Sequence, residues 1–239
     1  YNLDAIYYHL NLVFEFLRLE YYTHYKVYRE SEKYFEEVND AATNLLVNYT
    51  TYSFPAQFLI TKIQRHLRLG NEAELYAENE NLFIDYEVDA LDVPKHTIYI
   101  CYRALACYYA GKYDEAAKVL NNLLNEVSLK KFPITYMEVK ALLSLQYVML
   151  QDYELFNQLS NSIQRQIRML GKDSCENILL FLKILKITTS EAKKEKAKKI
   201  NAILPRLKSL EVKYFAPTLL IRFDDKFVKQ LTEMEPVTD

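Results

Sequence analysis

Apolar residues in the middle of the chain recur with the spacing of an amphipathic helix, and they do so twice in succession. The first run has apolar side chains at i, i+3 and i+4 intervals, namely Ile98, Cys101, Tyr102, Leu105 and Tyr108. The second run consists of Tyr113, Ala116, Ala117, Leu120, Leu123, Leu124 and Val127. Gly111 separates the two runs, and Asp114 and Glu115 follow it, where acidic groups oppose the positive N-terminus of a helix. The pattern predicts two helices joined at a left-handed Gly111, with Ala116 at a close helix–helix contact.

Proline and glycine punctuate the chain at nearly constant intervals. Pro55, Pro94 and Pro133 are evenly spaced, and Gly70 and Gly111 repeat at almost the same interval. Proline is tolerated in the first turn of a helix, and glycine suits the left-handed residue just past a helix end. Each proline-to-glycine segment has room for about four helical turns, and a second helix fits before the next proline. The spacing therefore predicts helical hairpins with a period of about 40 residues.

The same pattern extends over the whole chain. We expect an all-α fold: an α-solenoid of about five antiparallel helical hairpins plus a C-terminal capping helix, in a single domain over residues 1–239. The expected hairpins cover about residues 2–50, 55–90, 94–128, 133–170 and 174–209, and the final helix covers about 217–234. The first hairpin is expected to turn near Glu30 and Ser31, and Gln151 with Asp152 replaces the glycine turn of the fourth. Pro205 is expected to kink or end its helix.

Composition narrows the function classes. The 239 residues include 30 basic and 32 acidic side chains, so a formal charge of −2 gives no general attraction to nucleic acid or to an acidic membrane. We expect no nucleic-acid partner and no membrane span, because no apolar run is long enough to cross a bilayer. The three cysteines lie among apolar residues at no metal-ligand spacing and are interpreted as small buried hydrophobes. Because the sequence begins at Tyr1, we expect an excised or processed start.

No arrangement of residues indicates catalysis. The four histidines do not form a zinc-protease or di-iron motif, and three dispersed glycines cannot build a phosphate-binding loop. Glu20 and His24 share one helical face, which allows either a metal chelate or an ordinary surface pair. We expect no enzyme activity, no catalytic residues, no metal site and no cofactor.

Residues 104–116 carry a family resemblance. A small residue in the first helix, a Gly-x-Tyr-x-x-Ala turn and an alanine at the helix contact resemble the tetratricopeptide repeat, here with Gly111, Tyr113 and Ala116. The period is longer than that of the tetratricopeptide repeat, and large residues replace the alanine in neighbouring copies. The resemblance implies a stack of helix pairs in which the first helices line a concave groove. The partner-binding residues that it implies here are Gln57, Thr61, Gln64, Arg68, Tyr102 and Tyr109.

Charge and tyrosine are unevenly distributed. Between Lys183 and Lys213 there are ten basic and three acidic residues. The basic face formed by Lys194, Lys198 and Lys199 is interpreted as a solvated helix face or, alternatively, as a docking face for an acidic partner. Tyrosine is concentrated at the start of the chain, between Tyr1 and Tyr28, and one member of each adjacent pair must point away from the helix seam.

The leading hypothesis is a non-catalytic scaffold or adaptor that binds a protein or peptide partner, either an extended peptide or a helix, on the concave face. The alternative is a regulatory or sensor repeat domain that binds a signalling peptide or small ligand, with an effector domain outside this sequence.

Overall fold

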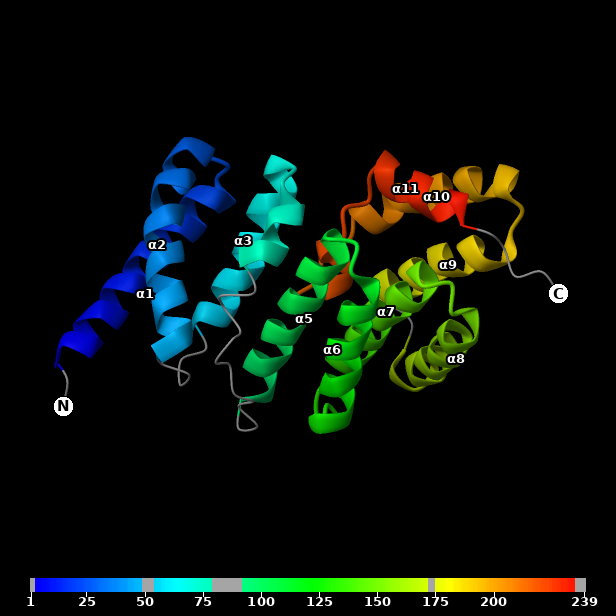
Figure 1. Ribbon diagram of the computed structural model, residues 1–239, viewed down its shortest axis with the longest axis horizontal. Helices are drawn as coiled ribbons and strands as arrows, with labels where there is room; N and C mark the ends of the chain where they lie inside the picture. Colours follow the sequence, from blue (N-terminus) through cyan, green and yellow to red (C-terminus); the bar gives the residue numbers. More distant parts are fainter. Residues whose placement is uncertain (1–2, 49–53, 79–91, 172–174, 235–239) are drawn as a thin grey trace. The chain divides into compact units, whose positions relative to one another are not determined.

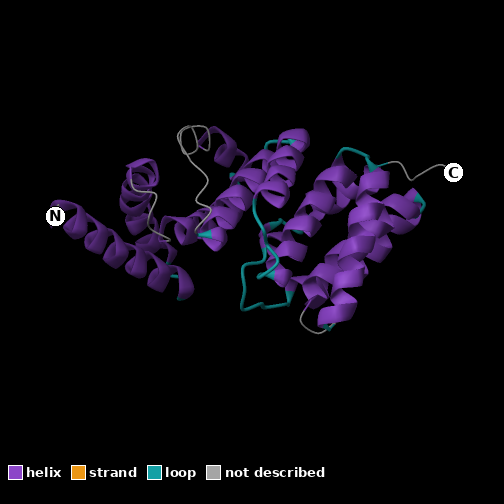
Figure 2. Cartoon of the chain, turned by 90° about the horizontal axis from the view of Figure 1, so that it is seen from below, coloured by secondary structure: helices purple, strands orange, loops and turns teal. Residues whose placement is uncertain are grey.

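The computed structural model describes residues 3–48, 54–78, 92–171 and 175–234 (Figure 1). Within these ranges every regular element is a helix and none is a strand, as Figure 2 shows. The all-α prediction is therefore confirmed for the described residues. The chain folds as two compact units, Tyr1–Tyr102 (unit 1) and Arg103–Asp239 (unit 2). One continuous solenoid domain over residues 1–239 stays a prediction.

Unit 1 is built from a helix pair and a third helix that packs on it. It contains α1 (Leu3–His24), α2 (Tyr28–Asn48), α3 (Phe54–Leu69), the 3-10 turn η1 (Glu72–Glu74) and the first part of α5 (Val93–Tyr109). Helices α1 and α2 pack along each other, and α3 contacts both of them. The core joins the three helices through Leu12, Phe16, Leu19, Phe35, Val38 and Phe58.

Unit 2 is organised around one central helix. It contains the end of α5, then α6 (Tyr113–Glu126), α7 (Pro133–Met149), α8 (Tyr153–Leu170), α9 (Glu176–Ser190), α10 (Lys193–Lys208), the 3-10 turn η3 (Pro217–Leu220) and α11 (Asp225–Glu233). Helix α7 contacts α6, α8 and α9, and its side chains from Met137 to Gln146 are buried without a break. Because its apolar residues are spread around the helix and are not confined to one face, this segment has only a weak amphipathic pattern.

Four helix ends share one capping geometry. At each, an N–H bonds back to the carbonyl five residues earlier: Val27 to Tyr22, Asn71 to His66, Lys112 to Cys107 and Asp152 to Tyr147, at 2.8–3.2 Å. The residue before each N–H is left-handed: Lys26, Gly70, Gly111 and Gln151, with φ between 58° and 81°. These are Schellman-type ends. They confirm the left-handed glycines and the turn at Gln151–Asp152.

The first turn and the last helix differ from the predictions. The first turn lies at Lys26, which adopts a left-handed conformation although it is not a glycine. The turn was predicted near Ser31, which instead lies inside α2. The segment expected to be one helix over residues 217–234 is η3 followed by α11. It breaks because the Asp224 carboxylate accepts the N–H of Phe227 at 2.9 Å and so begins a new helix. Helix α10 continues through Pro205 to Lys208.

The other expected helices have bounds close to those predicted, including those of α3, α5, α6, α7, α8, α9 and α10. Ala116 is fully buried on α6, which packs against α7. The second helix of the hairpin expected over residues 55–90 lies mostly outside the described residues.

Candidate functional site

A cavity of about 310 Å³ lies between the helices of unit 1. Helix α1 contributes Leu19 and Thr23, α2 contributes Tyr28, Ser31, Glu32 and Phe35, and α3 contributes Thr61, Gln64, Arg65 and Arg68. Three of the six residues predicted to bind a partner, Thr61, Gln64 and Arg68, therefore line one cavity. They share it because they follow one another at intervals of three and four residues along the same face of α3.

The cavity has an apolar floor and a cationic rim. Leu19 and Phe35 are buried side chains of the core. The Arg65 guanidinium lies 4.0 Å from the centre of the Phe35 ring, and the Arg68 guanidinium lies 4.1 Å from the centre of the Tyr28 ring. Stacking on an aromatic face holds a guanidinium in place while its edge stays able to bond.

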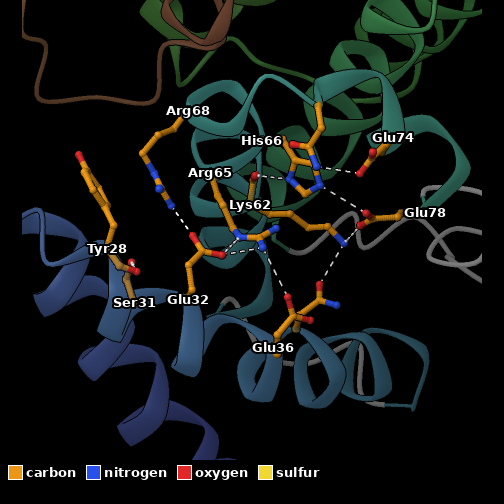
Figure 3. Close-up of polar contacts among 12 residues, drawn as sticks. Tyr28, Ser31, Glu32, Glu36, Lys62, Arg65, His66, Arg68, Glu74 and Glu78 are labelled. Atoms are coloured by element: carbon orange, nitrogen blue, oxygen red, sulfur yellow. Dashed lines mark hydrogen bonds and ion pairs between the residues drawn. The ribbon is translucent and has the colours of Figure 1, made fainter.

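Both guanidinium groups converge on one carboxylate (Figure 3). Arg65 donates to Glu32 Oε2 from Nε at 2.7 Å and from Nη2 at 2.6 Å, and Arg68 Nη2 donates to Glu32 Oε1 at 2.5 Å. Partial burial opposes ionisation of Glu32, but the two arginines outweigh it and lower the pKa of this carboxyl. A guanidinium has five N–H donors, so Arg68 retains donors for a second acceptor.

A second polar cluster fixes the far side of α3. Lys62 is almost fully buried; its Nζ donates to Asn39 Oδ1 at 3.0 Å and pairs with Glu78. His66 Nδ1 donates to the Lys62 carbonyl at 2.8 Å, and its Nε2 lies 3.3 Å from Glu78 Oε1 (Figure 3). Burial opposes ionisation of Glu78, but His66 and Lys62 outweigh it and lower its pKa to about 2. This cluster anchors the segment after η1 to α3 and so holds the cavity wall.

The predicted partner-binding residues differ in how far they are exposed to solvent. Gln57 is exposed on α3, as is Gln64, while Thr61 is buried and donates its hydroxyl to Glu20 at 2.6 Å. Tyr102 is only 1% exposed, so it packs in the interior and does not face a partner.

Tyr109 is engaged by the chain itself, because its hydroxyl bonds to the backbone of Leu220 and Arg222. The assignment of both tyrosines to an open groove is therefore corrected. The resemblance placed them by spacing alone, and spacing does not report what covers a helix face.

The basic face is exposed, with one exception. Lys194, Lys198 and Lys199 are exposed on α10, and Lys199 pairs with Glu191 at 2.7 Å. Lys196 is fully buried, and its Nζ donates to the Met234 carbonyl at 2.7 Å, at the end of α11. Lys196 therefore does not face water as the three lysines of the basic face do, because a helix C-terminus supplies an acceptor for it.

An apolar stripe on α1 was not recognised in the sequence. Leu10, Phe14, Leu17 and Tyr21 lie on the side of α1 opposite its core face, and Tyr25 directly follows the end of this helix; each of the five is 53–62% exposed. Their spacing of three and four residues is the signal that could have revealed the stripe. Of the adjacent pair Tyr21 and Tyr22, the first points outward and the second stacks on Tyr34 at 5.6 Å, as expected for one member of each pair.

Other chemistry is sparse in the part of the chain that the structure describes. All three cysteines are buried, as expected of small hydrophobes. No group of three or more histidine, cysteine, aspartate or glutamate side chains among the described residues is placed to hold a metal ion, and no described helix is long and apolar enough to cross a membrane. The expectation of no enzyme activity stays a prediction.

Comparison with known proteins does not extend this description. No protein-family model matches the chain. No curated protein and no solved structure matches it either.

Proposed function

We propose that the chain is a non-catalytic interaction protein, a tetratricopeptide-like helical-repeat scaffold that binds an extended peptide or a partner helix. The four equivalent helix ends support a repeat, since their left-handed residues, Lys26, Gly70, Gly111 and Gln151, recur at nearly constant intervals along the chain. Repeats of this kind stack into extended binding surfaces. The exposed stripe on α1 also supports an interaction role, because large exposed apolar patches mark contact sites.

The observation that carries the proposal is the cavity of unit 1. Its volume of about 310 Å³ is at the lower end of the range of ligand sites and suits one or two peptide side chains. Leu19 and Phe35 offer an apolar floor, and Arg68 offers donors at the rim. The matching ligand is a segment with an apolar side chain beside a carboxylate, because the two groups would contact the floor and the guanidinium together.

Peptide selection on the purified chain tests this function. We expect selected peptides to combine an apolar residue with an acidic residue. Arg68→Gln should weaken their binding about tenfold, because it removes hydrogen bonds to a charged acceptor. Lys118→Gln, which changes an exposed lysine of α6 in unit 2, is the matched control and should leave binding unchanged. If no peptide is selected, or if both substitutions have equal effects, the cavity is not the binding site.

The alternative, a sensor domain for a signalling peptide or small ligand, is favoured by the same cavity size. A small ligand would be bound inside the cavity, so short free peptides should raise the melting temperature of the chain. Folded proteins that bind this chain through the cavity would then compete with those short peptides for it. A scaffold that binds a long segment across several helices should instead lose affinity steadily as the segment is shortened.

A further inference from the structure

The chain crosses three helices of unit 2 with one short C-terminal segment, residues 214–222, here named the strap. Along its length the strap contacts first α9, then α7 and then α5, the reverse of the order of these helices in the chain. The Tyr214 hydroxyl donates to Asn177 Oδ1 of α9 at 2.8 Å, and Thr218 bonds to Glu138 of α7. Further along, the backbone of the strap bonds to Tyr109 of α5. The strap contains no α-helix; its only regular element is the four-residue η3.

Side chains of the helices hold the backbone of the strap. The Tyr109 hydroxyl donates to the Leu220 carbonyl at 2.6 Å and accepts the Arg222 N–H at 3.0 Å. The Glu138 carboxyl accepts the Thr218 N–H at 3.3 Å and the Thr218 hydroxyl at 2.7 Å. Backbone groups in helices and sheets are satisfied within the element. In the strap the N–H groups of Leu219 and Ile221 bond within the segment, but the Leu220 carbonyl and the N–H groups of Thr218 and Arg222 are bonded by side chains of other helices, as in the binding of a peptide.

The strap also fills apolar space. Ala216, Pro217, Thr218, Leu220 and Ile221 are all buried. Immediately after the strap, Phe223 packs edge-on against Phe181 of α9 and Phe227 of α11, with ring centres 6.2 Å and 5.4 Å apart. Unit 2 therefore recognises this segment through polar contacts to its backbone and through pockets for its side chains, the two elements of peptide recognition.

We propose that the strap is an intramolecular ligand of this face of unit 2, and that a segment of another protein with the same short turn can displace it. The displacing segment would carry the same groups: a tyrosine, a threonine four residues later and an apolar residue two residues after that. The proposal does not depend on the cavity of unit 1, because every residue in it belongs to unit 2. The two can therefore fail separately.

Glu138 provides a means of release. Its carboxyl is fully buried, and burial raises its pKa to about 7 against the hydrogen bonds from Thr218 and Asn177. Tyr214 and Cys175 also lie near it; burial raises the pKa of both, so both stay neutral when Glu138 ionises. Opening the strap admits water to Glu138 and restores a lower pKa. The closed state thus binds the proton more tightly, and opening should increase as the pH rises towards 7 and above.

Competition with the strap in the full-length chain tests the proposal. The probe is a fluorescently labelled peptide of residues 212–224, and binding is followed by anisotropy at pH 6 and pH 8. Thr218→Val in the chain removes the hydroxyl that Glu138 accepts but keeps the side-chain volume, whereas Thr218→Ser keeps the hydroxyl and is the control. The apparent affinity for the probe scales with the fraction of chains whose strap is open.

We expect Thr218→Val to bind the probe about tenfold more tightly than the unchanged chain, and Thr218→Ser to bind it within about twofold of the unchanged chain. Thr218→Val placed in the probe and not in the chain should weaken binding, because the probe then loses the bond to Glu138 while the strap keeps its own. The bound probe buries Glu138 as the strap does, so the affinity for the probe should be nearly the same at pH 6 and pH 8.

Hydrogen exchange of the strap amides gives an independent measurement. The amides of Thr218 and Arg222 should exchange faster than those of α7, which would show that the strap opens while the helices stay folded. The proposal is overturned if Thr218→Val binds the probe no better than the unchanged chain. It is also overturned if the strap amides exchange only together with α7.

Discussion

Replacing Glu138 with glutamine should remove a large part of the pH dependence of stability in unit 2. In the folded chain the pKa of Glu138 is raised to about 7 by burial, against an ordinary value of 4.5. Between these values the folded state holds a proton that the unfolded state releases. The free energy of unfolding therefore falls as the pH rises through this window, and it levels off above pH 7.

The size of the effect follows from the two pKa values. One pKa unit corresponds to about 1.4 kcal/mol, so the full window is worth about 3 kcal/mol, of which about 2.5 kcal/mol falls between pH 5 and pH 8. Glutamine is never charged. It can keep the contacts because its carbonyl can accept from Thr218, and a flipped Asn177 amide can accept from its NH₂ group while donating to Tyr214.

Urea titrations at several pH values measure the effect. The free energy of unfolding of Glu138→Gln minus that of the unchanged chain should rise by about 2.5 kcal/mol from pH 5 to pH 8. Glu126→Gln, which replaces an exposed carboxyl on α6, is the matched control and should show no such rise. A difference that stays constant with pH for Glu138→Gln would refute the reasoning, since it would mean that the buried carboxyl does not change its protonation on folding.

Three further predictions concern the turns, the helix contacts and the polar cluster of unit 1. Gly111→Val should lower the free energy of unfolding by more than about 1 kcal/mol in urea titrations, because Gly111 has a φ of +75°. A Cβ at this position would meet no atom within 4 Å, so the cost comes from the backbone conformation alone. Gly111→Asn should therefore destabilise much less, because asparagine tolerates this conformation. Ala116→Leu should destabilise by about 1–3 kcal/mol through overpacking, and an unchanged midpoint would contradict the contact with α7. Glu78 has a pKa lowered to about 2, so the stability it contributes should be present above pH 4.5 and be lost as the pH falls towards 2; acid titrations of Glu78→Gln should lack this loss.

The sequence predicts what depends on local pattern. Pro133 begins α7 and Gly111 follows α5 because proline and glycine restrict the backbone wherever they occur. Asp224 also had a readable signal, since an aspartate before an amphipathic run caps a helix, but the apolar periodicity around it suggested one continuous helix. Lys26 had no signal, because nothing about lysine indicates a left-handed residue.

The rest depends on contacts between distant parts of the chain. The Tyr109 hydroxyl bonds to a carbonyl 111 residues later, and Lys196 bonds to one 38 residues later. Neither bond can be predicted from a short stretch of sequence, so Tyr109 was assigned to an open groove, and nothing in the sequence indicated that Lys196 is buried. Thr61, Gln64 and Arg68 were found because they share one face of α3. Glu32 and Tyr28, which complete the cavity, come from another helix whose packing the sequence does not specify.

The most direct test of the interaction function compares two surfaces with one selected peptide. The first variant combines Gln64→Ala with Arg68→Gln in the cavity of unit 1, and the second reverses the charge of Lys194, Lys198 and Lys199 on α10. Binding is measured at low and high salt, because exposed charges are screened over about 8 Å at physiological ionic strength. If the cavity is the binding site, the first variant loses binding at both salt concentrations and the second retains it. Loss of binding in the charge-reversed variant alone would contradict the account.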